Sequence, residues 1–198
     1  SLGLVGSEDV YKRQPRIGVR FRLPASMNQV EYFGRGPAEN YLDRNAGSMV
    51  GLYKSTAEEL YFPYVRPQEN GHHTDTRWVS LSTGKKGLLI QADNTIGFNA
   101  LRNSIEDFDD EEATGLSRQW SNFTPEQVAN HDEAAAKNVL RRQHHINDIT
   151  PRDFVEVCVD LKQQGVAGYD SWGSRPEPAY TLPANREYNW GFTLIPLK

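Results

Sequence analysis

Cysteine is nearly absent from this 198-residue chain, which carries Cys158 alone. A single cysteine excludes an internal disulfide and any zinc cage built from several cysteines. It does not decide the redox compartment, because proteins without disulfides occur in every compartment. We expect Cys158 to pack as a small apolar side chain inside the fold.

Long apolar runs and charge runs of one sign are absent as well. No stretch approaches the roughly 20 apolar residues of a membrane-spanning helix, and the N-terminus lacks the basic and apolar regions of a signal peptide. The 22 basic and 26 acidic residues leave a net charge of −4 without a long run of either sign. These features predict a soluble chain that binds neither nucleic acid nor an anionic membrane.

Familiar catalytic and metal-binding motifs are also missing. The sequence holds no G-x-S-x-G elbow, phosphate-binding P-loop or H-E-x-x-H helix. The five histidines occur as His72-His73, His131 and His144-His145. Neighbouring strand residues point to opposite sides, so neither pair makes a metal site alone, and surface or loop positions are expected. The acidic stretch Glu106–Glu112 lacks EF-hand spacing and predicts a solvated loop.

The length and composition suit one globular domain with a sizeable core, since 37% of the residues are hydrophobic and 24% are charged. Residues 1–14 lack strand or helix periodicity, and DVYKRQ, Asp9–Gln14, resembles the translation of a transposon end used in sequencing adapters. We therefore predict a non-native leader or a disordered tail at residues 1–14. Residues 15–198 would form the domain, with native sequence missing before Pro15.

Alternating apolar and polar residues predict strands. In Arg16–Leu23 the large apolar side chains fall on one face and three arginines on the other. Phe154–Lys162 alternates similarly, with valines opposite Glu156, Cys158 and Asp160. Further strands are expected at Gln29–Gly34, Arg77–Thr83, Gly87–Asp93, Ile96–Asn103 and within Arg186–Leu197. A Gly84–Gly87 turn joins two of them as a hairpin, and the chain is predicted to be all-β with antiparallel strands.

Helical signals are confined to one region. Thr124, Pro125 and Gln127 fit an N-cap, a first-turn proline and a capping-box partner. They predict one or two short helices in the following residues. The segment GRGPAEN, Gly34–Asn40, has glycines but no lysine, serine or threonine for a phosphate, and it predicts a tight turn.

Trp172 stands in an unusual setting within GYDSWGS, Gly168–Ser174. The surrounding residues favour turns, and a tryptophan that serves a core rarely lies among them. Taken by itself, the segment favours a rim residue that packs over the edge of the fold or contacts another domain. Trp78 and Trp190 lie in strand-like patterns and are expected to be structural.

Three segments carry a resemblance to a known family. They are VEYFGRGPAENYLDR (Val30–Arg44), YFPYVRPQENG (Tyr61–Gly71) and GVAGYDSWG (Gly165–Gly173). In order and separation they resemble signature segments of the C-terminal domain, or small chain, of large bacterial β-galactosidases of the lacZ type, in glycoside hydrolase family 2. The resemblance covers the chain from about Arg16 to its end.

The resemblance implies a large antiparallel β-sandwich of the galactose-mutarotase-like type. It also implies that the complete protein hydrolyses terminal β-galactosides such as lactose with retention, using two glutamates about 5 Å apart. In the family both glutamates, and the magnesium and sodium ligands, lie in an upstream barrel. This chain is therefore expected to hold no catalytic residue, to bind no cofactor and to be inactive alone.

The partners implied by the resemblance are a β-galactoside, the upstream barrel domains and further copies of the complete protein in a homo-oligomer. The cytoplasm is the expected compartment for this family. The periplasm stays open as an alternative, because a missing N-terminus would also remove a signal peptide.

Trp172 matches the family's tryptophan that forms part of the sugar-binding floor. An indole is a rigid apolar platform for the C–H face of a sugar and has few torsions to freeze. Asp170 is a weaker candidate for sugar contact, and its carboxylate can also bind local backbone. The family usually has Gly-Gly-Asp where this chain has Ala167, Gly168 and Tyr169, a departure that bears on the conformation of the loop.

Four polar residues of the signature segments are expected to brace turns and interdomain contacts: Glu39, Arg44, Glu69 and Asn70. Three alternatives remain beside the β-galactosidase reading. The chain is a stand-alone carbohydrate-binding module, a purely architectural domain, or an aldose mutarotase. The last activity needs a histidine acid and a carboxylate base in one cleft, a pair that the sequence does not assemble.

Overall fold

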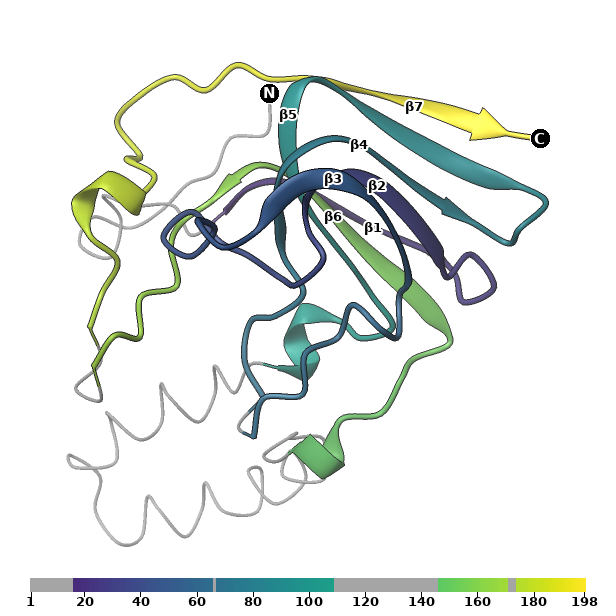
Figure 1. Cartoon of the computed structure of the whole chain (residues 1–198), viewed down its shortest axis with the longest axis horizontal. Coiled ribbons are helices and arrows are strands. Elements are labelled where there is room, and N and C mark those ends of the chain that lie inside the picture. Colours follow the sequence, from purple (N-terminus) through teal and green to yellow (C-terminus); the bar gives the residue numbers. More distant parts are fainter. Residues whose placement is uncertain (1–15, 66, 109–145, 171–173) are drawn as a thin grey trace, which may run out of the picture. The chain divides into compact units, whose positions relative to one another are not determined.

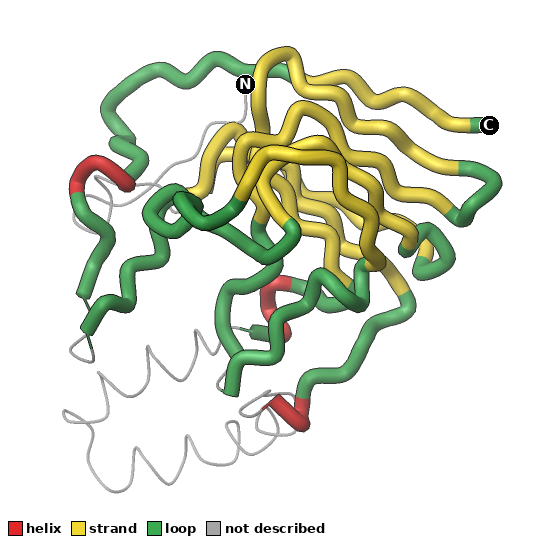
Figure 2. The backbone as a smooth tube through the Cα atoms, viewed as in Figure 1, coloured by secondary structure: helices red, strands yellow, loops and turns green. Residues whose placement is uncertain are grey.

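The computed structural model describes residues 16–65, 67–108, 146–170 and 174–198. Within these ranges the protein is all-β, and seven antiparallel strands form one sheet (Figure 1). The strands are β1 (Arg16–Pro24), β2 (Gln29–Gly36), β3 (Met49–Thr56), β4 (His73–Ser82), β5 (Gly87–Leu101), β6 (Phe154–Gln163) and β7 (Phe192–Leu197). In the described ranges the helices are short 3-10 turns, drawn red in Figure 2: η1 (Ile105–Asp107), η3 (Ile146–Asp148) and η4 (Pro178–Tyr180).

The sheet divides along its longest strand. Its order is β1-β6-β5-β4-β2-β3, and β7 also pairs with β5. Strand β4 follows one edge of β5, whereas the other edge pairs first with β7, over Gly87–Ala92, and then with β6, over Gly97–Leu101. One strand thus serves two sets of neighbours. This arrangement is consistent with the predicted antiparallel β-sandwich, and the all-β fold class is confirmed.

The predicted hairpin between β4 and β5 is confirmed, and the Thr83 amide closes it by donating to the Lys86 carbonyl at 2.8 Å. The prediction of a separate strand at Ile96–Asn103 is wrong, because β5 continues for 15 residues. Its turn-forming residues stay extended because the Asp93 amide donates to the Gly191 carbonyl at 3.1 Å. Irregularities in the β4 register take up the resulting offset.

Strands β1 and β6 carry side chains of opposite charge that pair with each other. β6 is buried on both faces, although its sequence suggested one polar face, because Glu156 and Asp160 are as enclosed as its valines. The arginines of β1 cover these carboxylates. Arg16 Nε lies 3.0 Å from Asp160 Oδ2, and Arg22 Nε lies 3.0 Å from Glu156 Oε2. Ion pairing therefore makes the burial of both acids tolerable.

The prediction of surface or loop positions is wrong for His72 and His73, each only 1% exposed. The ring of His73 stacks on Phe98 with centroids 5.1 Å apart, and Tyr32 lies 4.9 Å from it. The ring of His72 stacks on buried Tyr41 at 5.6 Å. Both imidazoles thus behave as aromatic core residues with polar edges.

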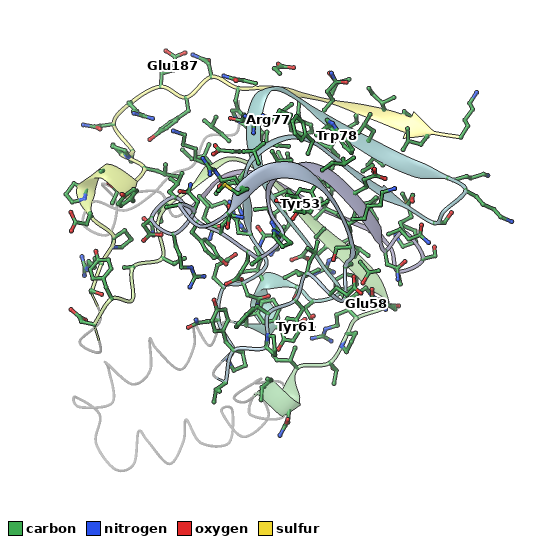
Figure 3. All side chains as sticks on the ribbon, viewed as in Figure 1. Tyr53, Glu58, Tyr61, Arg77, Trp78 and Glu187 are labelled. Carbon is green, nitrogen blue, oxygen red and sulfur yellow. The ribbon has the colours of Figure 1, made fainter. Side chains whose placement is uncertain are left out.

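Other expectations concern single side chains. Cys158 is buried, as predicted. Trp78 lies on β4 (Figure 3), and Trp190 precedes β7 with its ring 5.4 Å from that of Phe192. The expected helix from Thr124, residues 109–112 of the acidic stretch, and the remaining histidines lie outside the described residues. Among the described residues, no helix is long and apolar enough to cross a membrane.

The chain divides into two compact units. All seven strands belong to the unit that holds the described residues of 16–62, 70–102 and 153–198, and the other unit holds described residues 63–65, 67–69, 103–108 and 146–152. In the second unit Asp107 accepts hydrogen bonds from the Ser104 amide at 2.9 Å and from Arg152 Nε at 3.0 Å. Asn103 donates to the Thr150 carbonyl at 2.9 Å. The described part of this unit is thus held by its own polar contacts.

Candidate functional site

The loop that follows β6 is closed by three hydrogen bonds. At its base the Gly165 amide donates to the Tyr180 carbonyl at 2.8 Å. Farther out, the Tyr169 hydroxyl donates to the Arg175 carbonyl at 2.7 Å, and Asp170 Oδ1 accepts from the Ser174 amide at 3.2 Å. Asp170 is exposed and therefore binds local backbone at the outer end of the loop.

Trp172 falls between Asp170 and Ser174 in the sequence, and Ser171, Trp172 and Gly173 are outside the described residues. Its assignment as the sugar-stacking residue therefore stays a prediction. Ala167 and Gly168 lead into it with φ values of +54° and +83°. The left-handed region suits glycine but costs an alanine about 1 kcal/mol or more, so the surroundings must hold Ala167 in place.

The carboxylate of Asp43, in the first signature segment, stabilises this conformation of Ala167. Asp43 Oδ1 accepts the Val166 amide at 3.1 Å, and Asp43 Oδ2 accepts the Ala167 amide at 2.7 Å. Gly165 lies against the same carboxylate, where a Cβ atom would collide with it. Sequence reasoning missed Asp43, because no local signal connects it to a loop more than 120 residues away.

Asp43 itself stands in a tight turn. Tyr41 and Arg44 exchange backbone hydrogen bonds of 2.9 and 3.2 Å. Arg44 also forms an ion pair with Glu39 at 2.7 Å, and its guanidinium lies 5.1 Å from the centre of the Tyr41 ring. The other carboxylate oxygen of Glu39 accepts the Gly71 amide at 2.6 Å. Glu39 therefore ties the first signature segment to the end of the second.

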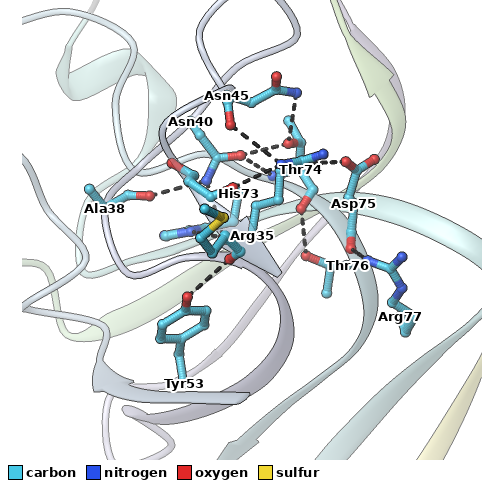
Figure 4. Close-up of polar contacts among 12 residues, drawn as sticks. Arg35, Ala38, Asn40, Asn45, Tyr53, His73, Thr74, Asp75, Thr76 and Arg77 are labelled. Atoms are coloured by element: carbon cyan, nitrogen blue, oxygen red, sulfur yellow. Dashed lines mark hydrogen bonds and ion pairs between the residues drawn. The ribbon is translucent and has the colours of Figure 1, made fainter. Parts of the chain in front are cut away.

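Asn40 anchors the start of this turn in the core. Its side-chain oxygen accepts from the amide and the hydroxyl of Thr74 at 2.9 and 2.6 Å. Its side-chain nitrogen donates to the carbonyls of Arg35 and Ala38, both at 3.1 Å (Figure 4). Asn40 is fully buried, so its polar atoms are satisfied by protein groups rather than by water.

The predicted pair Glu69 and Asn70 is divided between the two units. Asn70 is buried in the strand-bearing unit, where its side chain accepts the Phe62 amide at 3.2 Å. Its carbonyl accepts from the side chain of Asn99 at 2.8 Å. Glu69 is half-buried and belongs to the second unit. Asn70 therefore fixes the second signature segment from inside.

One histidine and one carboxylate come together in the core. His72 Nδ1 lies 4.0 Å from Asp160 Oδ2 and 2.8 Å from Asn99 Oδ1. Burial, together with the nearby charge of Arg16, lowers the pKa of His72 to about 3. The imidazole is thus neutral at pH 7 and enclosed with its neighbour. This pair cannot reach a sugar and gives the mutarotase alternative no support.

Side chains that could bind a metal ion are spread over the fold. Across residues 16–65, 67–108, 146–170 and 174–198, no three histidine, cysteine, aspartate or glutamate side chains are grouped as a metal ion would need.

Comparison with known proteins places these contacts in a family. A family model described as the β-galactosidase small chain matches residues 4–194. The chain is 35% identical over 184 residues to a β-galactosidase of Priestia megaterium, an overlap of 92% of this chain and 15% of that protein. A β-galactosidase of Arthrobacter sp. (strain B7) is 42% identical over 99 residues, covering 47% of this chain and 10% of its own length.

A β-galactosidase of Vibrio cholerae is 29% identical over 180 residues, which are 91% of this chain and 14% of the relative. The chain thus spans a small fraction of the length of these relatives. The family model, in contrast, covers nearly all of this chain. The protein therefore belongs to the β-galactosidase small-chain family.

Proposed function

We propose that this chain is the C-terminal part of a retaining β-galactosidase that hydrolyses terminal, non-reducing β-D-galactose residues. The observation that carries the proposal is the meeting of the three signature segments. Asp43 of the first segment binds the backbone of the third, and Glu39 of the first binds Gly71 of the second. The first segment is thus bonded both to the second segment and to the backbone that leads into the loop bearing Trp172.

In this proposal the chain contributes binding rather than bond cleavage. Retaining hydrolysis needs a nucleophile and an acid/base carboxyl group about 5 Å apart, and we assign both to the upstream barrel. Trp172 stacks against the apolar face of the galactose ring. The π face of its indole also favours the partly positive sugar ring of the transition state. Binding energy that grows in the transition state accelerates the reaction.

The remaining parts of the proposal follow the family resemblance. The barrel domains and further copies of the complete enzyme are the protein partners, and the cytoplasm is the compartment. Magnesium and sodium belong to the barrel, and no step is assigned to them here. The chain by itself is expected to hydrolyse nothing.

A stand-alone carbohydrate-binding module is the second candidate. Tyr169 favours it, because this large aromatic residue is 62% exposed beside Asp170 in the same loop. A module of this kind would bind galactosides without any partner domain. Direct titration of the isolated chain with lactose therefore distinguishes the two candidates.

The main test is aryl-β-galactoside hydrolysis by three proteins. They are this chain alone, the Priestia megaterium relative without its matching C-terminal part, and a chimera in which residues 15–198 replace that part. Only the chimera is expected to be active. Activity of the chain alone, or a folded but inactive chimera, contradicts the proposal.

Trp172→Ala in the active chimera tests the assigned residue. We expect kcat/KM to fall about 10- to 100-fold, the range that loss of about 1.4 to 2.7 kcal/mol of transition-state stabilisation produces. Trp78→Phe on strand β4 is the matched control and should leave the kinetics unchanged. Equal activity of the Trp172→Ala and parent chimeras would show that the chain is purely architectural.

A further inference from the structure

We propose that Asp43 is a positioning residue, whose carboxylate sets the path of the backbone into the Trp172 loop and thereby presents the indole to the sugar. This inference rests on the proposed function. It concerns a residue outside the predicted set of site and brace residues. The role is carried by hydrogen bonds between a side chain and the backbone, and it needs no contact between Asp43 and the substrate.

The two amides that Asp43 binds point in a common direction. Val166 and Ala167 are consecutive, and both donate to the Asp43 carboxylate, at 3.1 and 2.7 Å. Successive amides of an extended chain point to opposite sides, so a common acceptor requires the chain to turn. The turn is visible in the left-handed φ values of Ala167 and Gly168. Anionic acceptors are well suited to such concave arrangements of amides.

Asp43 stands on a rigid support. The turn that carries it is closed by reciprocal hydrogen bonds between Tyr41 and Arg44. Tyr41 is buried and stacks on His72, and the Glu39 ion pair holds Arg44. A side chain anchored in this way can impose a conformation on its partner. A side chain on a loose loop would instead follow its partner.

The base of the loop fits closely against Asp43. Gly165 leaves room for the carboxylate, because a Cβ atom there would collide with Asp43. The Gly165 amide also donates to the Tyr180 carbonyl, so the loop base cannot move away from Asp43 without losing that hydrogen bond. Trp172 lies only five residues beyond Ala167. An error in backbone direction at Ala167 therefore propagates to the indole.

The kinetic test is a double-mutant cycle in the active chimera, with Asp43→Asn, Trp172→Ala and both together. The asparagine is nearly the same size, but its amide nitrogen cannot accept a hydrogen bond. We expect Asp43→Asn to lower kcat/KM about tenfold, mainly through KM, because small misplacements of binding groups are costly. In the Trp172→Ala background the same change should have no further effect.

The outcomes separate the two proposals. If Trp172→Ala leaves the kinetics unchanged, the proposed function of the loop fails whatever Asp43 does. If Trp172→Ala lowers kcat/KM but Asp43→Asn does not, the positioning role is overturned. It is also overturned if the two losses multiply, because independent effects would then act. Asp153→Asn, an exposed carboxylate before β6, is the matched control and should have no effect.

A second measurement reports on the environment of the Trp172 indole and does not depend on enzymatic activity. The 198-residue chain labelled with 5-fluorotryptophan gives fluorine resonances for its four tryptophans, and Trp172→Phe assigns one of them. Asp43→Asn should shift or broaden the Trp172 resonance while those of Trp78 and Trp190 stay in place as reporters of folding. Gly165→Ala, which keeps the charge of Asp43 but displaces it, should do the same. An unchanged Trp172 resonance in both variants overturns the inference.

Discussion

Acidification from pH 7 to pH 5 should destabilise the fold through its two buried histidines. Burial lowers the pKa of His72 to about 3 and that of His73 to about 4, so both are neutral in the folded protein. In the unfolded chain an imidazole titrates near pH 6.5. Between these values the unfolded state binds more protons than the folded state. The contribution that these two neutral histidines make to the free energy of unfolding is therefore fully present above pH 6.5, and it is lost as the pH falls below that value.

The magnitude follows from the same pKa values. Each histidine contributes a slope that approaches about 1.4 kcal/mol per pH unit below pH 6.5. Between pH 7 and pH 5 this gives about 2 kcal/mol for each residue and about 4 kcal/mol for the pair. That loss is a large share of the 5 to 15 kcal/mol that stabilises an ordinary domain, so the expected effect is well above experimental error.

The assay is urea unfolding followed by tryptophan fluorescence at pH 7, 6 and 5 and constant ionic strength. Substitution His73→Gln removes one of the two titrating groups, and the drop in unfolding free energy should shrink by about 2 kcal/mol, whatever the absolute stability of the variant. An equal drop in the parent and in this variant would refute the reasoning. So would a parent whose stability is constant from pH 7 to pH 5.

Three further predictions concern buried polar groups and the thiol. Asp160→Ala should cost about 3 to 5 kcal/mol in chemical denaturation, because it leaves the partly buried Arg16 guanidinium without its carboxylate. Asn40→Ala should cost about 2 to 4 kcal/mol in the same assay, because it orphans buried partners such as the Thr74 amide. Cys158 is only 2% exposed, so it should resist an aromatic disulfide reagent until denaturant unfolds the chain, and rapid labelling of the native protein would contradict its burial.

Strands with a regular pattern could be predicted from the sequence, whereas strands set by distant partners could not. The alternation in β1 marks a strand by itself, because one of its faces is more exposed than the other. Strand β3 gives no such signal, since it pairs with β2 alone and leaves Leu52 59% exposed. The residues Asp93–Thr95 favour a turn, but β5 stays extended through them, with Ala92 paired to Phe192 before them and Ile96 paired to Thr76 after them. Non-local hydrogen bonds overrode local propensity at these positions.

Contacts between residues far apart in the sequence also explain why the burial of His72 and the attachment of the Trp172 loop were not predicted. Nothing local in HHTDT shows that His72 will stack on Tyr41 and hydrogen-bond to Asn99, so its burial became visible only in three dimensions. The signature segments were recognisable because a family resemblance supplied the long-range information. That resemblance pointed to Trp172, but it did not reveal the contact from Asp43 that ties the segments together.

The contact also explains how the loop can depart from the family pattern. Asp43 binds the amides of Val166 and Ala167, and an amide is present whichever side chain follows it. Substitution at Ala167 or Tyr169 can therefore change the surface of the loop while its attachment to the sandwich stays the same. Val166 and residues 168–170 are exposed, so charge-assisted hydrogen bonds hold the backbone at Val166 and Ala167 where little packing is available. At 2.7 Å such a bond is far shorter than the screening length of physiological salt, so the attachment should withstand salt but not replacement of the carboxylate by an amide.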